Sequence, residues 1–307
     1  MHFASRLSRW VALCLLPLAA SCGNPVRAQA GDSALAGRIW QARATAFVAA
    51  ADVQRAVREA PVVLLGETHD NLEHHRLQRE LLAGIVATGR HPALVMEQFD
   101  REFQAPLDAE RARSGRTADT VMDAGHFNRR GWQVEGYRPL VALALEFDLP
   151  IVAANLSRDD ARSIVRDPAH AALPPVDRSV EDALAADIDR SHCGEKVPPA
   201  LLAGMVAAQR ARDLAMAQSL ERAGARGAVL IAGVGHVRAD RGAPLYMKKR
   251  PLVIAFVEVE PDLQRPEEYL DGLFATGASF DYIWFTTRAT RADPCAEKPA
   301  LPGLPQR

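Results

Sequence analysis

Two apolar segments of the chain are each followed by glycine and then by histidine. The segment 62–65, Val-Val-Leu-Leu, leads into Gly-Glu-Thr-His, which contains Glu67 and His69. The segment 228–232, Ala-Val-Leu-Ile-Ala, leads into Gly-Val-Gly-His, which contains His236. Carboxylate and imidazole groups held close together can move protons during hydrolysis, and they can also ligate a divalent metal that activates water.

The residues before these motifs indicate how the acidic and imidazole groups are positioned. Short runs of β-branched and apolar residues are typical of interior strands of a parallel sheet. A third run, 93–97, ends in Glu97. Because ligands bind beyond the carboxyl ends of strands in open α/β sheets, we expect the two glutamates and the two histidines to meet at one edge. A polar turn between strand and helix is the alternative for the first motif alone, but the second strand–glycine–histidine motif favours a shared site.

The wider pattern predicts one α/β domain. Strand and helix patterns alternate along most of the chain, and we expect a mixed, mainly parallel central sheet flanked by helices. Residues 34–59 are expected to form a helical lead-in, and residues 100–137 a helical insertion over the sheet edge. The domain is expected to span residues 33–288, followed by a loose tail at 289–307. The further predicted strands are 150–154, 252–259 and 282–285.

Aromatic and basic side chains in two places are of the types that a porphyrin site needs. Tyr137 stands beside Arg138, and Tyr246 follows His236 in the sequence. Haem iron needs an axial imidazole or phenolate, together with an apolar slot and cations for the propionates. An aromatic residue taken alone is more often part of a core, so the grouping with histidines is what favours this interpretation.

One predicted helix, 200–223, carries polar residues on an otherwise apolar face. Gln209 and Asp213 interrupt a row of aliphatic side chains. A buried polar group needs a partner. The sequence leaves two explanations, a structural ion pair such as Arg212–Asp213 and a role in a pocket.

The amino-terminal residues have the pattern of an export signal. Basic residues precede an apolar segment, 10–20, that is too short to span a bilayer. Ala-Ala-Ser-Cys at 19–22 is similar to a lipobox, although alanine replaces the usual leucine, so we expect a lipoprotein signal at 1–21 and lipidation of Cys22. Cleavage after Ala30 is the alternative. We expect an exported protein, lipid-anchored in the bacterial cell envelope at the outer membrane facing the periplasm.

Composition excludes some partners and predicts one covalent link. The chain of 307 residues has a formal net charge of −1 and no basic run with interleaved aromatic residues, so we expect no nucleic-acid partner. No apolar stretch reaches the roughly 18–20 residues of a membrane span. Cys193 and Cys295 are the cysteines left after the signal, and two cysteines in an exported chain predict one disulfide.

Four ordered segments resemble the ChaN family of haem-binding lipoproteins, part of a wider α/β group with Tiki-type proteases and erythromycin-esterase-like hydrolases. The segments are LLGETHDNLEHHRLQ, VMEQFD, GYRPLVALALEFDLPIVAANLSR and AGVGHVRADRGAPLYM, and the resemblance covers about residues 37–260. The site motifs of the wider group match at Glu67, His69 and His236. The resemblance implies a haem- or iron-acquisition protein that forms a homodimer, with haem near the subunit interface.

The first function that these observations favour is extracytoplasmic haem binding by a lipoprotein of haem and iron uptake. The candidate iron ligands are His69, Tyr137 and His236. Arg138 is expected near a haem propionate, and Tyr246 is a further candidate for contact with the cofactor.

The alternative function is hydrolysis. Glu67, His69, Glu97 and His236 would act as a Glu–His acid–base system, or they would hold a divalent metal ion such as zinc or manganese. The rim of acidic and imidazole groups favours the enzyme, because haem needs one or two ligands and carries negative propionates of its own. The extent of the ChaN resemblance favours the haem-binding protein.

Overall fold

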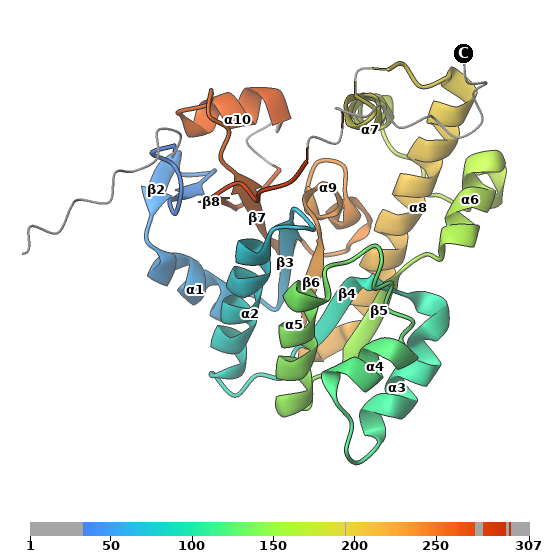
Figure 1. Ribbon diagram of the computed structural model, residues 1–307. Helices are drawn as coiled ribbons and strands as arrows, with labels where there is room; N and C mark the ends of the chain where they lie inside the picture. The colour runs from blue at the N-terminus through green and yellow to red at the C-terminus, as the bar shows by residue number, and fades with distance from the viewer. Residues whose placement is uncertain (1–32, 194, 274–278, 293–294, 296–307) are drawn as a thin grey trace, which may run out of the picture. The chain divides into compact units, whose positions relative to one another are not determined.

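The computed structural model describes residues 33–193, 195–273, 279–292 and 295. Within these ranges eight strands form one sheet in the order β2-β1-β8-β7-β3-β6-β4-β5 (Figure 1). Strands β3 to β8 pair in parallel, whereas β1 is antiparallel to both β2 and β8. The predicted mixed, mainly parallel sheet is therefore confirmed. The strands are β1 (Ile39–Gln41), β2 (Ala46–Val48), β3 (Val62–Glu67), β4 (Ala93–Asp100), β5 (Ile151–Asn155), β6 (Ala228–Gly233), β7 (Leu252–Glu258) and β8 (Tyr282–Thr286).

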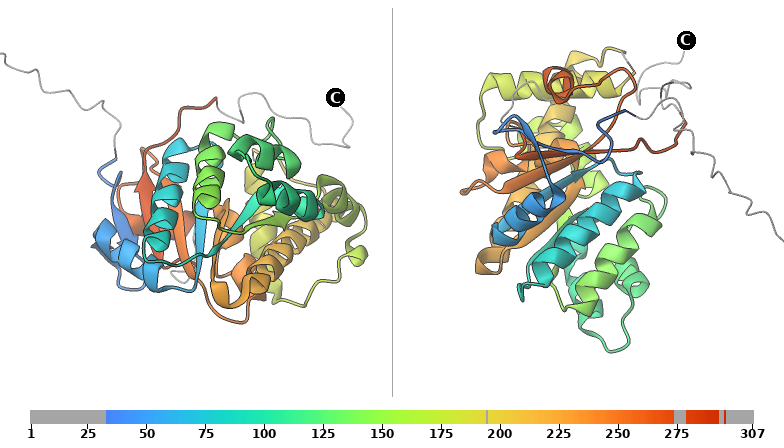
Figure 2. Two further views of the ribbon diagram at one scale, coloured as in Figure 1. Left: turned by 90° about the horizontal axis from the view of Figure 1, so that it is seen from below. Right: turned by 90° about the vertical axis from the view of Figure 1, so that its left-hand side faces the viewer.

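Helices cover both faces of this sheet (Figure 2). Helices α1 to α5 pack in one apolar core, and α8 and α10 pack in the other. None of the described helices combines the length and apolar character that crossing a membrane requires. The helices are α1 (Ala50–Glu59), α2 (Leu72–Val86), α3 (Gln104–Ala112), α4 (Ala118–Ala124), α5 (Val134–Glu146), α6 (Arg158–Arg166), α7 (Arg178–Ser191), α8 (Pro199–Ala223), α9 (Val234–Val237) and α10 (Pro266–Leu273).

Strand β3 lies in the middle of the sheet because its side chains are apolar on both faces. Val63 and Leu65 belong to the core under α2, and Leu64 belongs to the core under α8. This alternation follows from the period of two along a strand. The polar Glu67 is the last residue of the strand and follows the aliphatic run 62–65 and Gly66.

Helix α2 begins at the same edge of the sheet. Asn71 is its N-cap, and the side-chain oxygen of Asn71 accepts hydrogen bonds from the backbone N–H groups of Glu73 and His74. These bonds satisfy amides that the first helical turn leaves without partners. The cap fixes the first turn of α2 over the end of β3, with His74 and His75 both buried.

The predicted helical insertion is present between β4 and α5. It consists of the short 3₁₀ helix η1 (Arg101–Phe103) and of α3 and α4. Strand β4 is longer than expected and continues to Asp100, while Tyr137 lies inside α5 and not in the insertion. The sequence did not predict the last three residues of β4, because Glu97 and Gln98 interrupt the apolar pattern of the strand, although both side chains are buried.

The prediction of a helical lead-in at 34–59 was wrong for its first half. Strands β1 and β2 form a hairpin there, and only α1 is helical. Trp40 and Phe47 pack edge to face across the hairpin with ring centroids 5.0 Å apart. Each strand has three residues, which is too short for an alternating pattern to appear in the sequence. The hairpin is positioned by β8, a partner far away in the chain.

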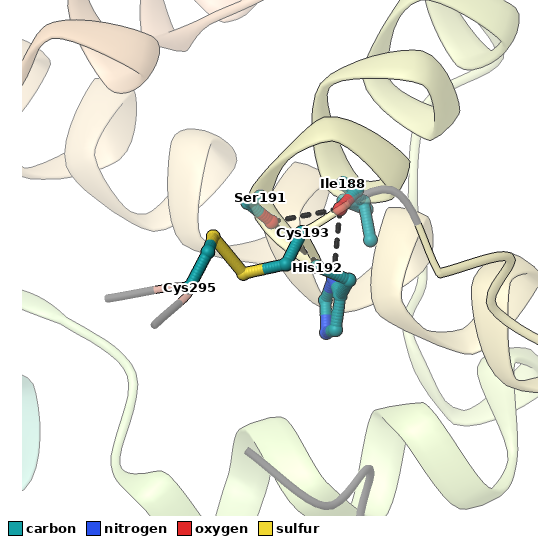
Figure 3. The surroundings of a disulfide bond; sticks show 5 residues. All are labelled: Ile188, Ser191, His192, Cys193 and Cys295. Atoms are coloured by element: carbon teal, nitrogen blue, oxygen red, sulfur yellow. Dashed lines mark hydrogen bonds between the residues drawn. A yellow bond between two sulfur atoms is a disulfide. The ribbon is translucent and has the colours of Figure 1, made fainter. Parts of the chain in front are cut away.

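The described part of the predicted tail is bound to the domain. Arg291 forms ion pairs with Asp70 at 2.6 Å and with Glu258 at 2.5 Å, so the chain beyond residue 288 is not loose there. Cys193 and Cys295 form the expected disulfide, with their Cα atoms 5.5 Å apart. Figure 3 shows this bond beside the end of α7.

Candidate functional site

Glu67 is the centre of a buried hydrogen-bond network at the carboxyl end of β3. Its Oε1 accepts from the Tyr137 hydroxyl, from His69 Nδ1 at 3.0 Å and from Gln98 Nε2 at 3.3 Å. Its Oε2 accepts from Gln78 Nε2 at 2.7 Å. A carboxylate with this many donors is stabilised in its charged form.

His75 completes the network from the first turn of α2. Its Nε2 donates to the carbonyl of His69 at 3.1 Å, and its Nδ1 lies 3.2 Å from Glu67 Oε2 and 3.2 Å from Gln78 Oε1. Since both ring nitrogens face acceptors, the network assigns two protons and a positive charge to His75. Burial opposes this charge, but the hydrogen bond and the charge of Glu67 outweigh it and raise the pKa of His75.

The charges of these groups are mutually dependent. Burial alone would favour the neutral form of Glu67, but His69 and His75 hold the pKa of its carboxyl far below the usual range. Tyr137 responds in the opposite direction. Burial and the negative charge of Glu67 raise the pKa of the phenol far above its usual value, so the hydroxyl keeps its proton.

His69 is the member of this network that solvent reaches. Its side chain is 41% exposed, and Trp132 packs against it edge to face with ring centroids 4.6 Å apart. Glu67 receives the Nδ1 proton, and no other described residue hydrogen-bonds to Nε2. The ring also requires glycine beside it, because a Cβ at Gly233 would lie 2.9 Å from His69 Nε2. His69 therefore presents a free nitrogen at the mouth of the site.

His236 lies between two carboxylates on the other side of Gly233. Its Nδ1 donates to Asp213 Oδ1 at 2.6 Å, and its Nε2 is 3.4 Å from Glu97 Oε1. The backbone N–H of Gly233 donates to Glu97 Oε2 at 2.8 Å. Burial opposes the charge on His236, but Glu97 and Asp213 raise its pKa to about 10. Although burial favours the neutral acid, His236 lowers the pKa of Glu97 to about 2.

The partner of Asp213 differs from the pair considered in the sequence analysis. Arg212 does not hydrogen-bond to Asp213 but donates to Asn155 Oδ1 at 2.5 Å. Gln209, one turn earlier on α8, lies 3.2 Å from His236 Nδ1. The polar residues on the apolar face of α8 therefore contact the site, because that face packs over the end of β6.

The structure brings five of the predicted residues together at the ends of β3, β4 and β6, and it excludes two others. Arg138 points away from the site, with its side chain 44% exposed and bound to Asp119 at 2.9 Å. Successive residues on a helix are about 100° apart, so the burial of Tyr137 turns Arg138 outward. Tyr246 lies in the 3₁₀ helix η4 (Ala243–Tyr246), and its hydroxyl accepts from Arg210 at 3.2 Å, away from the Glu67 network.

Two of the three predicted iron ligands do not fit that role. Tyr137 has no exposed surface and its hydroxyl is bound to Glu67, whereas ligation needs an accessible phenolate. Both ring nitrogens of His236 face carboxylates. Sequence reasoning also did not assign His75, Gln78 and Gln98 to the site, and it left a role in a pocket as one of two explanations for Asp213. The sequence feature that could have indicated His75 and Gln78 is their position shortly after the Gly-Glu-Thr-His motif.

A cleft of about 220 Å³ opens at the carboxyl ends of β4 and β5, and Trp132, which packs on His69, forms part of its wall. Trp132 and Leu156 line it, together with the basic side chains Arg158 and Arg212. Arg158 has no ion pair with any described residue.

Nowhere in the described ranges do three or more His, Cys, Asp or Glu side chains gather in an arrangement that could hold a metal ion, so the donor set expected for zinc or manganese is not found there.

Comparisons with known proteins agree with this architecture. The model of the family described as "Haem-binding uptake, Tiki superfamily, ChaN" matches residues 53–247. The structure of ChaN of Campylobacter jejuni, reported for cofacial haem binding, is similar with a TM-score of 0.65 and 21% identity, covering 80% of this chain and 95% of that chain. An erythromycin esterase in its open conformation has a TM-score of 0.40 and 11% identity, covering 76% of this chain and 92% of that chain. No curated protein matches the sequence.

Proposed function

The chain belongs to the ChaN haem-binding uptake family, and we propose that it is an extracytoplasmic lipoprotein that binds haem and takes part in haem and iron uptake. The observation that carries this proposal is the state of His69. Its Nδ1 donates to Glu67 while its Nε2 is free at an exposed edge of the site. A histidine that ligates a metal typically donates its other ring N–H to a carboxylate or carbonyl in this way.

The cleft beside His69 supplies the other groups that haem requires. Trp132 offers an aromatic surface, and Arg158 is a cation available for a propionate in place of the predicted Arg138. The cleft is smaller than the roughly 300–1,000 Å³ of pockets that enclose a ligand. Haem held here would keep one face open, and such a face suits the cofacial binding reported for the Campylobacter protein and a homodimer with haem near the subunit interface.

The acidic rim, which argued against haem, is partly neutralised within the protein. Glu67 is paired with His69 and His75, and Glu97 is paired with His236. Each carboxylate therefore faces a histidine and not the cleft alone, which reduces repulsion of the propionates. When bound, haem would supply the iron centre. The residues of this chain would orient the haem and set the charge of its surroundings.

The proposed location rests on the amino-terminal signal and on the disulfide. Cys22 and the signal lie outside the described residues, and the proposal places a lipid anchor on Cys22 in the outer membrane, facing the periplasm. The Cys193–Cys295 bond supports an oxidising compartment, because cytosolic proteins rarely keep structural disulfides. Radiolabelled palmitate incorporated into the wild type but not into Cys22→Ala would test the anchor. Equal labelling of both would contradict it.

Haem binding is tested by titrating the exported protein with haemin and recording absorbance. We expect a shifted Soret band together with partial quenching of tryptophan fluorescence, because Trp132 lines the cleft. Arg158→Ala should weaken haemin binding about tenfold to a hundredfold, corresponding to loss of one charge-assisted hydrogen bond. Arg138→Ala is the matched control and should leave binding unchanged, because Arg138 points away from the cleft. A wild-type protein without a Soret shift would contradict the proposal.

Hydrolysis remains the second candidate, favoured by the position of His236 between Glu97 and Asp213. A charged imidazole next to a carboxylate is suited to general acid–base chemistry. We would assay ester and peptide substrates without metal and with added zinc or manganese. Activity in the wild type that is lost in Glu97→Gln, together with no haemin binding, would favour the hydrolase over the haem-binding protein.

A further inference from the structure

A second cleft, of about 590 Å³, lies along the free edge of the sheet. Strand β5 is the last strand in the sheet order, and α3 and the end of α8 flank it (Figure 1). The cleft extends along Pro150 to Ala153 and reaches Ala93, so it runs toward the amino ends of β4 and β5 and away from His69. Its size is within the range of small-molecule sites.

Gln104 occupies part of the hydrogen-bonding edge of β5. Its Nε2 donates to the carbonyl of Ile151 at 3.0 Å, and its Oε1 accepts from the backbone N–H of Ala153 at 2.7 Å. The amide side chain thus replaces a neighbouring strand over this stretch. This arrangement leaves the side chains around the cleft to determine what binds there.

Three arginines line this cleft, and their positive charges are not balanced. Arg101 donates to the neutral Gln218, and Arg222 donates to the neutral Ser219. Arg226 has no hydrogen bond or ion pair with any described residue. Burial and the positive charge of Arg222 lower the pKa of Arg101, which indicates that the two guanidinium groups repel each other.

The negative charge nearby is smaller than the positive charge. Asp108 is the only carboxylate that lines the cleft among the described residues, and it accepts from Gln104. The carboxyl end of α8 adds only about half an elementary charge from the helix dipole. Guanidinium groups bind phosphate and carboxylate in a bidentate manner, so an unbalanced cluster of them is suited to an oxyanion.

We propose that the β5-edge cleft binds a small anion with two or more negative charges, a phosphate ester or a polycarboxylate, through Arg101, Arg222 and Arg226. Ser219 Oγ donates to the carbonyl of Ala215 and accepts from Arg222, so it helps to orient one of the cations. The site is separate from the His69 cleft, so its occupation does not depend on haem. Pyrophosphate and citrate are suitable probes of the two oxyanion chemistries.

Calorimetric titration of the exported protein with each probe, at ionic strength held constant with sodium chloride, tests this site. We expect saturable binding to the wild type and at least tenfold weaker binding to the Arg222→Ala/Arg226→Ala variant. Arg130→Ala removes an exposed arginine outside the cleft and should leave affinity unchanged. Equal weakening in Arg130→Ala would mean that the anions respond only to net charge, which would overturn the proposal.

A second measurement uses only the wild type, so a variant that fails to fold does not limit the test. Phenylglyoxal modifies accessible arginines, and mass spectrometry reports which ones. Bound pyrophosphate should slow modification of Arg222 and Arg226 by about fivefold or more, while Arg130 reacts at its usual rate. If neither probe protects these arginines, they act only as charges that keep the free edge of β5 from pairing with another chain.

Discussion

At the residue scale, Glu67 is the side chain on which the site depends, because its two oxygens receive hydrogen bonds from three different elements. The donors come from α2, β4 and α5, and the exposed His69 adds a fourth contact. A buried carboxylate of this kind costs free energy unless its partners are all present. The network therefore orients His69 and ties the helices to the sheet at the same time.

Glu67→Gln should destabilise the protein by about 3 kcal/mol, since it leaves the buried, charged His75 without its counter-ion. Urea unfolding followed by circular dichroism measures this loss. Glu80→Gln is the matched control, because Glu80 is exposed on α2 and pairs only with Arg76. That substitution should change stability by less than about 0.5 kcal/mol. Equal stabilities of the two variants would show that the network does not hold the fold.

His236 should make stability depend on pH in a defined direction. Its pKa is about 10 in the folded protein against an ordinary value of 6.5, so the folded state binds the proton more tightly. The stabilisation is fully present below about pH 6.5 and is lost as the pH rises toward about 10. The difference in Tm between the wild type and His236→Gln should therefore shrink over this range. A difference that stays constant with pH would contradict the ion pairs with Glu97 and Asp213.

Residues at strand ends were the part of the site that the sequence could predict. Glu67, His69, Glu97 and His236 meet because parallel strands bring their carboxyl ends to one edge. Asp213 could be singled out on α8, but its partner could not, since helix packing brings it to His236 from a distant part of the chain. The orientation of Arg138 depends on which face of α5 is buried. The position of Arg138 next to Tyr137 in the sequence suggested a shared site but did not indicate that the two side chains point in different directions.

At the element scale, the contact between α2 and α5 determines how closely Tyr137 approaches Glu67. Gly136 of α5 packs directly on His75, and an added Cβ would lie 2.2 Å from the His75 Cδ2 atom. Gly136→Ala should therefore destabilise the protein by about 1–3 kcal/mol through overpacking, despite the better helix propensity of alanine. Thermal unfolding monitored by circular dichroism gives the comparison.

Gly84 provides the control on the partner helix. A Cβ there would meet nothing within 4 Å, so Gly84→Ala should stabilise the protein by about 0.5–1 kcal/mol. The expected outcome is that Gly136→Ala lowers the stability of the protein and Gly84→Ala raises it. If both variants are more stable than the wild type, α5 can move away from α2 without loss of stability. The close contact between Gly136 and His75 would then not position the site.

Elements with strong local patterns were predictable, and elements that depend on distant partners were not. The runs of aliphatic residues in β3, β6 and β7 identified interior strands because both of their faces are buried. The hairpin of β1 and β2 has little local pattern and forms because β8 offers an edge. The long helix α8 was recognised together with the polar Gln209 and Asp213 on its apolar face, but their partner His236 comes from a distant part of the chain.

At the scale of the whole molecule, the disulfide should contribute strongly to stability. Cys193 and Cys295 are separated by 102 residues, and closing a loop of that length stabilises the folded state by about 4.7 kcal/mol in the chain-entropy model. A reductant should lower the urea midpoint of the wild type to that of Cys295→Ser, and it should not change the midpoint of the variant. An unchanged wild-type midpoint would show that the bond does not restrict the unfolded chain.

The central claim is that an exposed histidine held by Glu67 is the group that meets haem iron, while the buried tyrosine only supports it. Haemin titrations of His69→Ala and Tyr137→Phe, with the Soret band recorded at equal protein concentration, test this most directly. We predict that His69→Ala loses the shifted Soret band and that Tyr137→Phe keeps it, because Tyr137 has no exposed surface. A band that disappears in Tyr137→Phe and persists in His69→Ala would contradict the account.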